Sequence, residues 1–222
     1  MKERIVIAAA HPDDLIGSAG LVLLLKDRYE FHLFDFTRGE AGLPGVPYDE
    51  VAKTRTAEEF AACKHADVTP HFLGEIDGEA YANRGVTERM VGLLEELRPR
   101  AVIAHWPVDI HKDHVMSTAS TLRAIDLAKI SPEIYFYEET YQSRSFCPRF
   151  YVDITSVFDE KVALIREYHC QNVNDHIVRN KTQDAIFRGS QAGVKYAEAY
   201  AVFEPISPTA KCIFNDLPAV CL

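Results

Sequence analysis

Apolar runs alternate with amphipathic segments through the first half of this 222-residue chain, and this alternation limits its fold more than any other feature. The strand-like runs are Ile5–Ala10, Phe31–Phe36, His71–Leu73 and Ala101–His105. Between them, apolar residues recur at helical spacing over Asp14–Arg28, Asp49–His65 and Val86–Leu97. Strand and helix in repetition are typical of a parallel sheet whose crossover helices cover both faces.

The second half continues with further elements and no repeat or interdomain linker. Strands are expected at Glu133–Tyr137, Phe150–Asp153 and Ala199–Phe203, and helices at Ser156–Tyr168 and Asp175–Ser190. We therefore predict one α/β domain over residues 1–222, with a Rossmann-like, mostly parallel sheet and helices on both faces.

Composition and charge exclude several classes of protein. The net charge of −9 offers no basic surface for nucleic acid or an anionic membrane. No apolar run approaches the roughly 20 residues that span a bilayer, and Met1–Arg4 lacks the layout of a signal peptide. The five cysteines are scattered without a CxxC pair, which favours reduced thiols. We expect a cytoplasmic protein with no nucleic-acid partner and no membrane span.

Two short tracts of histidine and aspartate follow two of the predicted strands. The first is His11–Asp14, directly after the first strand, and the second is His111–His114, shortly after the strand at Ala101–His105. Ligands of open α/β sheets bind beyond the carboxyl ends of the strands. The predicted fold could therefore bring the two tracts together, although about a hundred residues separate them.

The residue types in these tracts suit a hydrolytic metal. His11, Asp14 and His114 offer a nitrogen, oxygen and nitrogen set that fits zinc, with iron, cobalt and manganese as other divalent candidates. Asp13 is then free to act as general base on a metal-bound water, whose pKa a metal lowers towards roughly 7.

The second tract adds a candidate general acid. His111 could stabilise an oxyanion and donate a proton to a leaving nitrogen, and Asp113 would hold that imidazole in the correct tautomer. Each tract alone also fits a helix cap or a solvated turn. Because both tracts follow strands of one domain, a metal site is favoured. His105, at the end of its strand, could line the same cleft.

These residues resemble the PIG-L/LmbE-like family of zinc-dependent N-acetylglucosaminyl deacetylases, over nearly the whole chain. The family's AHPDDE motif corresponds to Ala10–Leu15, and its HxDH motif to His111–His114. Further similarity lies at Thr37–Gly42, Arg55–Glu58, Leu73–Gly78, Lys161, Ala163, His169, Gln171, Arg188–Gly189 and Tyr196–Tyr200.

The resemblance implies a hydrolase that removes an N-acetyl group from an N-acetylglucosamine-type amino sugar or conjugate, with the ligand and acid–base roles given above. It adds Arg55 and Asp77 as contacts to sugar hydroxyls. Without the resemblance, the sequence would instead favour a pair between Arg55 and Glu58 or Glu59 on the surface of its helix, and a role for Asp77 as a turn residue.

One position departs from the family pattern, because Leu15 stands where the family has glutamate. We expect Leu15 to pack into the core beneath the site. The alternatives are an amidase acting on a different acyl group or a thiol conjugate, and a non-catalytic sugar- or metal-binding protein, although Asp13 and the second tract argue against the last. The apolar segment Ile213–Leu222 could pack on a second copy in a homo-oligomer or on the chain's own core.

Overall fold

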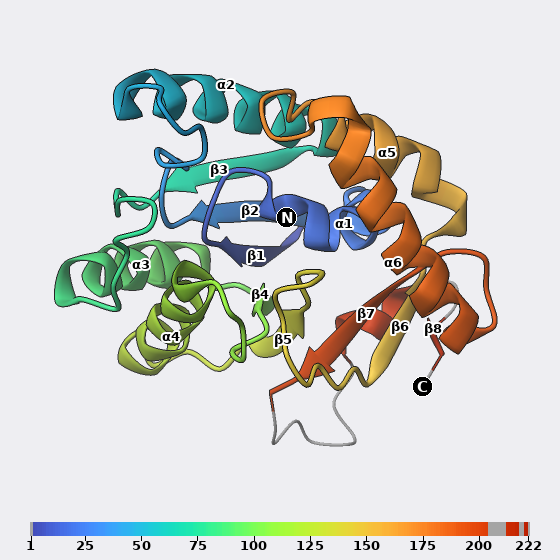
Figure 1. Ribbon diagram of the computed structural model, residues 1–222. Helices are drawn as coiled ribbons and strands as arrows, with labels where there is room; N and C mark the ends of the chain where they lie inside the picture. The colour runs from blue at the N-terminus through green and yellow to red at the C-terminus, as the bar shows by residue number, and fades with distance from the viewer. Residues whose placement is uncertain (1, 204–211, 218–219, 222) are drawn as a thin grey trace.

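The computed structural model describes residues 2–203, 212–217 and 220–221, which form one sheet of the order β3-β2-β1-β4-β5-β7-β6-β8 (Figure 1). The strands are β1 (Glu3–Ala9), β2 (Tyr29–Asp35), β3 (Val68–Phe72), β4 (Ala101–His105), β5 (Glu133–Tyr137), β6 (Phe150–Asp153), β7 (Ala197–Val202) and β8 (Val220–Cys221). Strands β1 to β5 are parallel, whereas β7 runs antiparallel to both β5 and β6, and β8 runs antiparallel to β6.

Helices cover both faces of this sheet (Figure 1). The α-helices are α1 (Ala19–Leu25), α2 (Tyr48–Ala66), α3 (Arg84–Leu97), α4 (Lys112–Leu127), α5 (Phe158–Ile165) and α6 (His176–Ala192). Within the described residues, the short 3-10 helices are η1 (Asp14–Ser18), η2 (Thr155–Val157), η3 (Val173–Asp175) and η4 (Ile213–Asp216). Helices α3 and α4 pack together on one face, and α1, α2 and α5 pack on the other.

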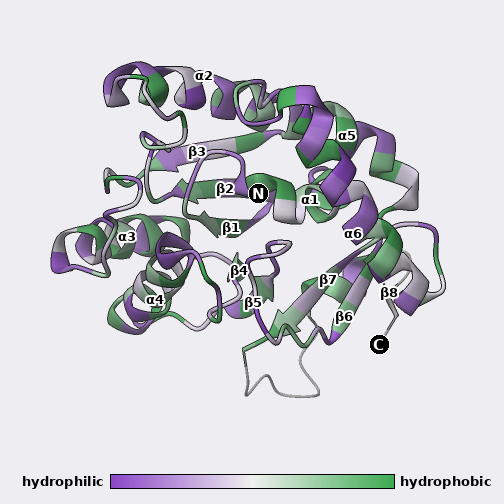
Figure 2. Ribbon diagram, viewed as in Figure 1, coloured by the Kyte–Doolittle hydropathy of each residue, from purple (hydrophilic) through white to green (hydrophobic). Residues whose placement is uncertain are grey.

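Alternating side chains of the central strands join separate cores on the two faces of the sheet. Ile5 and Ile7 of β1 join the core beneath α1, α2 and α5, whereas Val6 joins the core beneath α3 and α4. Figure 2 shows hydrophobic residues along the central strands β1 and β2, and many hydrophilic residues on α2 and α6. Burial on both faces explains why these strands are apolar runs without alternation.

The structure confirms the predicted α/β class and the mostly parallel sheet, and β4, β5 and β6 have the predicted bounds. The helix predicted over residues 14–28 differs, because its first turn is the 3-10 helix η1 and α1 begins only at Ala19. The insertion of β7 between β5 and β6 was not predicted, since a local apolar pattern does not specify which strands pair.

The described part of the C-terminal segment packs on the chain's own core. Ile213 and Phe214 are buried, and the Phe214 ring stacks on Phe150 with a centroid separation of 4.6 Å. Leu222 lies outside the described residues. The alternative packing of Ile213 and Phe214 on a second copy is therefore wrong.

A buried carboxylate joins the antiparallel end of the sheet to the start of α1. Glu198 of β7 accepts hydrogen bonds from the backbone N–H groups of Gly20 (2.7 Å) and Leu21 (2.9 Å). The same carboxylate accepts from Lys161 Nζ at 2.6 Å and from the Tyr200 hydroxyl at 2.8 Å. The late family-like positions Lys161 and Glu198 thus form a structural anchor, distant from the two histidine tracts in sequence.

We expect Lys161→Met to lower the free energy of unfolding by about 3 kcal/mol, because it leaves the Glu198 charge buried without its cation. Urea denaturation followed by circular dichroism measures this change. Lys26→Met is the matched control, since the partly exposed Lys26–Glu160 pair, 2.7 Å long, should contribute at most about 1 kcal/mol. Equal losses in both variants would contradict the anchoring role of Glu198.

Two further predictions concern membrane-spanning helices and the state of the cysteines. Within residues 2–203, 212–217 and 220–221, no helix combines the length and apolar character that crossing a membrane requires. Cys63, Cys147, Cys170 and Cys212 are free thiols, as the scattered spacing predicted.

Candidate metal centre

The two histidine tracts meet at one edge of the sheet. Strands β1 and β4 are parallel neighbours, and the strand order reverses between them, so both tracts leave the sheet at the same crevice. A cavity of about 500 Å³ opens there. Both tracts line it, together with the loops after β2, β3 and β5 and the first turns of α6.

The three predicted ligands converge on this cavity. His11 Nδ1 lies 3.5 Å from Asp14 Oδ2, and His114 Nε2 lies 3.7 Å from Asp14 Oδ1. The Asp14 carboxylate also accepts the backbone N–H groups of Ala10 and His11 at 2.9 and 2.8 Å, which fixes its orientation. Burial alone would raise the pKa of Asp14, but the imidazoles of His105 and His114 hold it well below its usual value.

Each of the two imidazoles predicted as ligands has a carboxylate at its other nitrogen. His11 Nε2 lies 3.2 Å from Asp77 Oδ1 and 3.4 Å from Asp113 Oδ2. His114 Nδ1 lies 3.5 Å from Asp109 Oδ2. A histidine that binds a metal commonly donates its second N–H to a carboxylate, which orients the ring and makes it a better ligand. The residues present therefore fit a divalent metal, for which His11, Asp14 and His114 stay the predicted ligands.

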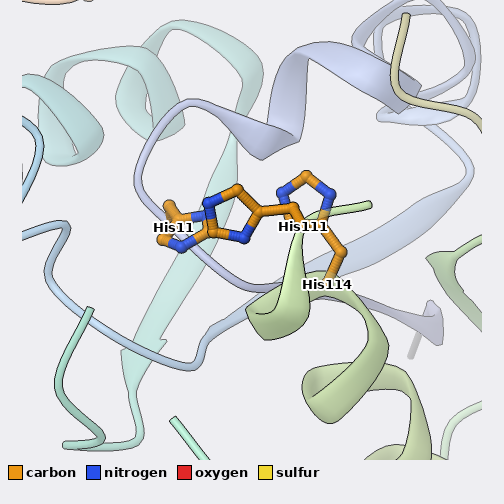
Figure 3. Close-up of side chains that lie close together, drawn as sticks. All are labelled: His11, His111 and His114. Carbon is orange, nitrogen blue, oxygen red and sulfur yellow. The ribbon is translucent and has the colours of Figure 1, made fainter. Parts of the chain in front are cut away.

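His111 offers a third imidazole at the edge of this group. His11, His111 and His114 place one nitrogen each within 4.8 Å of the others, and Figure 3 shows the three side chains close together. His111 directly precedes α4, and its ring stacks on His114 with centroids 4.6 Å apart, as the spacing of three residues predicted. It lines the cavity and is only partly buried, so it is accessible to a bound substrate.

His105 lies beneath the cavity, where it supports Asp14. Its Nε2 is 3.0 Å from Asp14 Oδ2 and 3.0 Å from the Tyr137 hydroxyl, and its ring stacks on His114 at 3.9 Å. Burial and the nearby His114 lower the pKa of His105 to about 4, so the ring is neutral. The expectation that His105 lines the cleft is thus wrong in placement, although the residue belongs to the site.

Asp13 lines the same cavity without joining the ligand group. Its backbone has a φ of 107°, a left-handed conformation that is rare for a non-glycine residue. The Asp13 N–H donates to the buried Glu59 at 2.9 Å, and Asp13 Oδ2 lies 3.2 Å from Arg55 Nη2. Burial raises the pKa of Asp13 to about 6 against the opposing effect of Arg55.

Arg55 and Asp77 both line the cavity, but they also have partners within the protein. Arg55 reaches across to the carbonyl oxygens of Pro12 and Gly39, where the glycines at 39 and 42 make room for its guanidinium group. The helix-surface pairing of Arg55 with Glu58 or Glu59 is therefore wrong. Asp77 accepts the N–H of Ala41 at 3.1 Å besides facing His11, so it is more than a turn residue. Contact of either side chain with a sugar stays a prediction.

Asp113 lies elsewhere than expected. It contacts His11 Nε2 and accepts the Gly78 N–H at 2.7 Å, instead of holding the His111 ring. The reason is helical geometry: Asp113 lies two residues after His111 on α4, and residues two apart on a helix do not face each other. Asp113 thus orients an imidazole of the site, but not the one predicted.

Leu15 is fully buried in the core beneath η1, as expected. The nearby carboxyl group comes instead from α2, where Glu59 accepts the Asp13 N–H and also hydrogen bonds from the Tyr168 hydroxyl (3.1 Å) and the Cys63 thiol (3.4 Å). Burial raises the pKa of Glu59 to about 7. Glu59 holds the backbone of Asp13, a role that no motif indicated.

Sequence reasoning missed Asp109, Glu139 and Gln142. A signal existed for Asp109, because it precedes His111 by two residues and continues an alternation of acid and histidine. Its carboxylate accepts the His111 N–H at 2.7 Å and faces His114. Glu139 and Gln142 follow β5 in a loop with no recognisable pattern, yet both line the cavity.

Comparison with known proteins places the chain among relatives with different activities. It is 26% identical over 209 residues to 4-oxalmesaconate hydratase of Pseudomonas putida, covering 84% of this chain and 80% of the relative. A conserved protein from Thermus thermophilus has a similar structure, with a TM-score of 0.79, 27% identity and coverage of 96% and 100%. The N,N'-diacetylchitobiose deacetylase of Pyrococcus horikoshii shares the fold, with a TM-score of 0.77, 23% identity and coverage of 93% and 87%.

The family model described as GlcNAc-PI de-N-acetylase (PIG-L) matches residues 6–125. This stretch is more than half of the chain and contains both histidine tracts, Arg55 and Asp77. The chain therefore belongs to the PIG-L family of enzymes, as its two motifs indicated.

Proposed function

We propose that this protein is a metal-dependent N-deacetylase, with zinc as its metal, that acts on an N-acetylglucosamine-type amino sugar or a conjugate of one. One observation carries the proposal. His11, Asp14 and His114 converge with a carboxylate behind each imidazole, while Asp13 lines the same cavity outside that group. A site for metal binding alone has no use for a separate, partly buried base.

A divalent metal bound there would activate water and polarise the acetyl carbonyl group. The chain's own residues supply the proton transfers. Asp13 takes the proton from the attacking water, and Arg55 at 3.2 Å keeps the carboxylate in place. His111, at the edge of the imidazole group, stabilises the developing negative charge on oxygen and donates a proton to the departing nitrogen. The products are acetate and a free amine.

A second candidate function is the hydration of an unsaturated polycarboxylate, because the Pseudomonas putida relative is a hydratase. The charge of the cavity favours the amide instead. The permanently cationic side chains that line it are Arg55 and Lys181, and each is already paired, Arg55 with Asp13 at 3.2 Å and Lys181 with Glu139 at 2.7 Å. With Asp14 and Asp77 also present, the described side chains of the cavity carry no surplus positive charge for several substrate carboxylates beyond the charge that a bound metal would add.

The test is acetate release from N-acetylglucosamine and N,N'-diacetylchitobiose by the protein as purified, after chelation, and after zinc is restored. We expect activity that chelation abolishes and zinc returns. Loss of the ultraviolet absorbance of 4-oxalmesaconate without acetate release would favour the hydratase. Release of another acid from a panel of N-acyl and thiol-conjugate amides would show that the enzyme removes a different acyl group. Zinc binding without any turnover would favour a binding protein.

We also expect the deacetylase to need an ionised Asp13. Burial raises the pKa of Asp13 to about 6, and a bound cation would lower it again, so the acid limb of activity should lie at or below about pH 6. Below that limb, kcat/KM should fall about tenfold per pH unit, because only the deprotonated carboxylate accepts a proton. A pH profile of kcat/KM measures this, and activity that rises on acidification through pH 6 would contradict it.

A further inference from the structure

The loop after β5 brings two unpartnered acceptors to the cavity. Glu139 Oε1 and Gln142 Oε1 are buried and have no hydrogen-bond partner among the described residues, and both side chains line the cavity. The other oxygen of Glu139 accepts from Lys181 Nζ at 2.7 Å, which fixes the carboxylate. Nearly all buried acceptors in proteins have a donor, so water or a bound ligand is expected to supply donors to these two oxygens.

The loop is held rigidly against the segment that carries the second histidine tract. The Glu139 N–H donates to Ser143 Oγ at 2.9 Å, and the Ser143 hydroxyl donates to Asp109 Oδ2 at 3.0 Å. The Ile110 N–H donates to the Gln142 carbonyl at 3.1 Å. The acceptors are thus fixed relative to His111 and His114, which Asp109 contacts directly.

The chemistry of these atoms specifies the ligand. A carboxylate oxygen without a proton accepts hydrogen bonds and repels anions, so Glu139 suits O–H groups and disfavours substrate carboxylates. Between the two acceptors, Tyr141 lines the cavity with 66% of its surface exposed, and it can cover the apolar face of a ring. Sugar rings combine several hydroxyl donors with such a face.

We propose that Glu139 and Gln142 determine specificity by accepting hydrogen bonds from hydroxyl groups of a sugar ring, beside Tyr141. This inference rests on the proposed deacetylase function and adds the residues that select a hydroxylated amide. A site with buried acceptors rejects an analogue that lacks the matching donors, since the acceptors then lose water without gaining a partner.

The test compares two amides on the zinc-loaded protein, N-acetylglucosamine and N-acetylcyclohexylamine, whose ring carries no hydroxyl groups. We expect the wild type to favour the sugar, and Gln142→Leu to reduce the ratio of the two kcat/KM values about 10- to 100-fold. Gln183→Leu, at an exposed position of α6 outside the cavity, is the control that keeps the wild-type ratio. Glu139→Gln should also reduce the ratio, but it removes the partner of Lys181, so Gln142→Leu is the decisive variant.

A binding measurement separates this inference from the proposed function. Ligand-observed nuclear magnetic resonance compares methyl β-D-glucoside with propane-1,2,3-tricarboxylate on wild type and Gln142→Leu. Weaker binding of the glucoside to the variant than to the wild type supports hydroxyl recognition. This holds even if neither amide is hydrolysed, because the lack of hydrolysis contradicts only the deacetylase function. Hydrolysis with an unchanged ratio in Gln142→Leu, or stronger binding of the tricarboxylate, overturns the recognition proposal.

Discussion

Asp13→Asn should lower kcat about 10²- to 10⁴-fold while the zinc content stays at the wild-type level. Asparagine has nearly the shape of aspartate but cannot take a proton from water at neutral pH. The predicted ligands His11, Asp14 and His114 remain, because Asp13 is not one of them. Steady-state kinetics together with metal analysis by mass spectrometry measure both quantities on the same preparation.

The matched control is Asp27→Asn, which makes the same change at an exposed position outside the cavity. It should leave both turnover and zinc content unaltered. Turnover near the wild-type rate in Asp13→Asn would remove Asp13 from the role of base. Loss of zinc from that variant would instead make Asp13 part of the metal site.

His114→Ala should reduce zinc affinity by more than 100-fold and abolish turnover. Loss of a residue that only hydrogen-bonds to a metal ligand typically lowers metal affinity about 10- to 100-fold, and loss of the ligand itself lowers it more. Competition with a chromophoric chelator gives the dissociation constant. His65→Ala, a histidine outside the cavity that lies 3.9 Å from Glu167, should bind zinc as the wild type does.

Two further variants decide which imidazoles hold the metal. His111→Ala should keep zinc but lose turnover, because His111 is assigned as the acid. If it loses zinc as completely as His114→Ala, the three-imidazole group of His11, His111 and His114 is the binding site instead. Asp109→Ala should weaken zinc binding about 10- to 100-fold, since its carboxylate faces His114 Nδ1.

The sequence allowed the parallel half of the fold to be predicted, because buried parallel strands are continuous apolar runs and crossover helices are amphipathic. The bounds of β4 and the helix pattern of α3 illustrate this. The antiparallel end of the sheet could not be predicted in this way. Nothing local in the segment Ala197–Val202 indicates that it pairs between β5 and β6, because pairing depends on the packing of distant residues.

The same contrast holds within the site. The convergence of His11, Asp14 and His114 follows from two tracts at the ends of strands, and the topology rule then brings those ends together. The tertiary partners were not predictable in this way. Asp113 faces His11, and Glu59 reaches the backbone of Asp13, only because α4 and α2 approach the first tract in space.

The link between Ser143 and Asp109 has a consequence for redesign. The matched family region ends at residue 125, so the predicted metal ligands lie within it and the loop with Glu139 and Gln142 lies beyond it. A graft that exchanges residues 139–142 for those of a relative should transfer preference between substrates while the chemistry stays in place. Such a graft must retain Ser143, because its hydroxyl joins the new loop to the Asp109 carboxylate, which contacts His111 and His114.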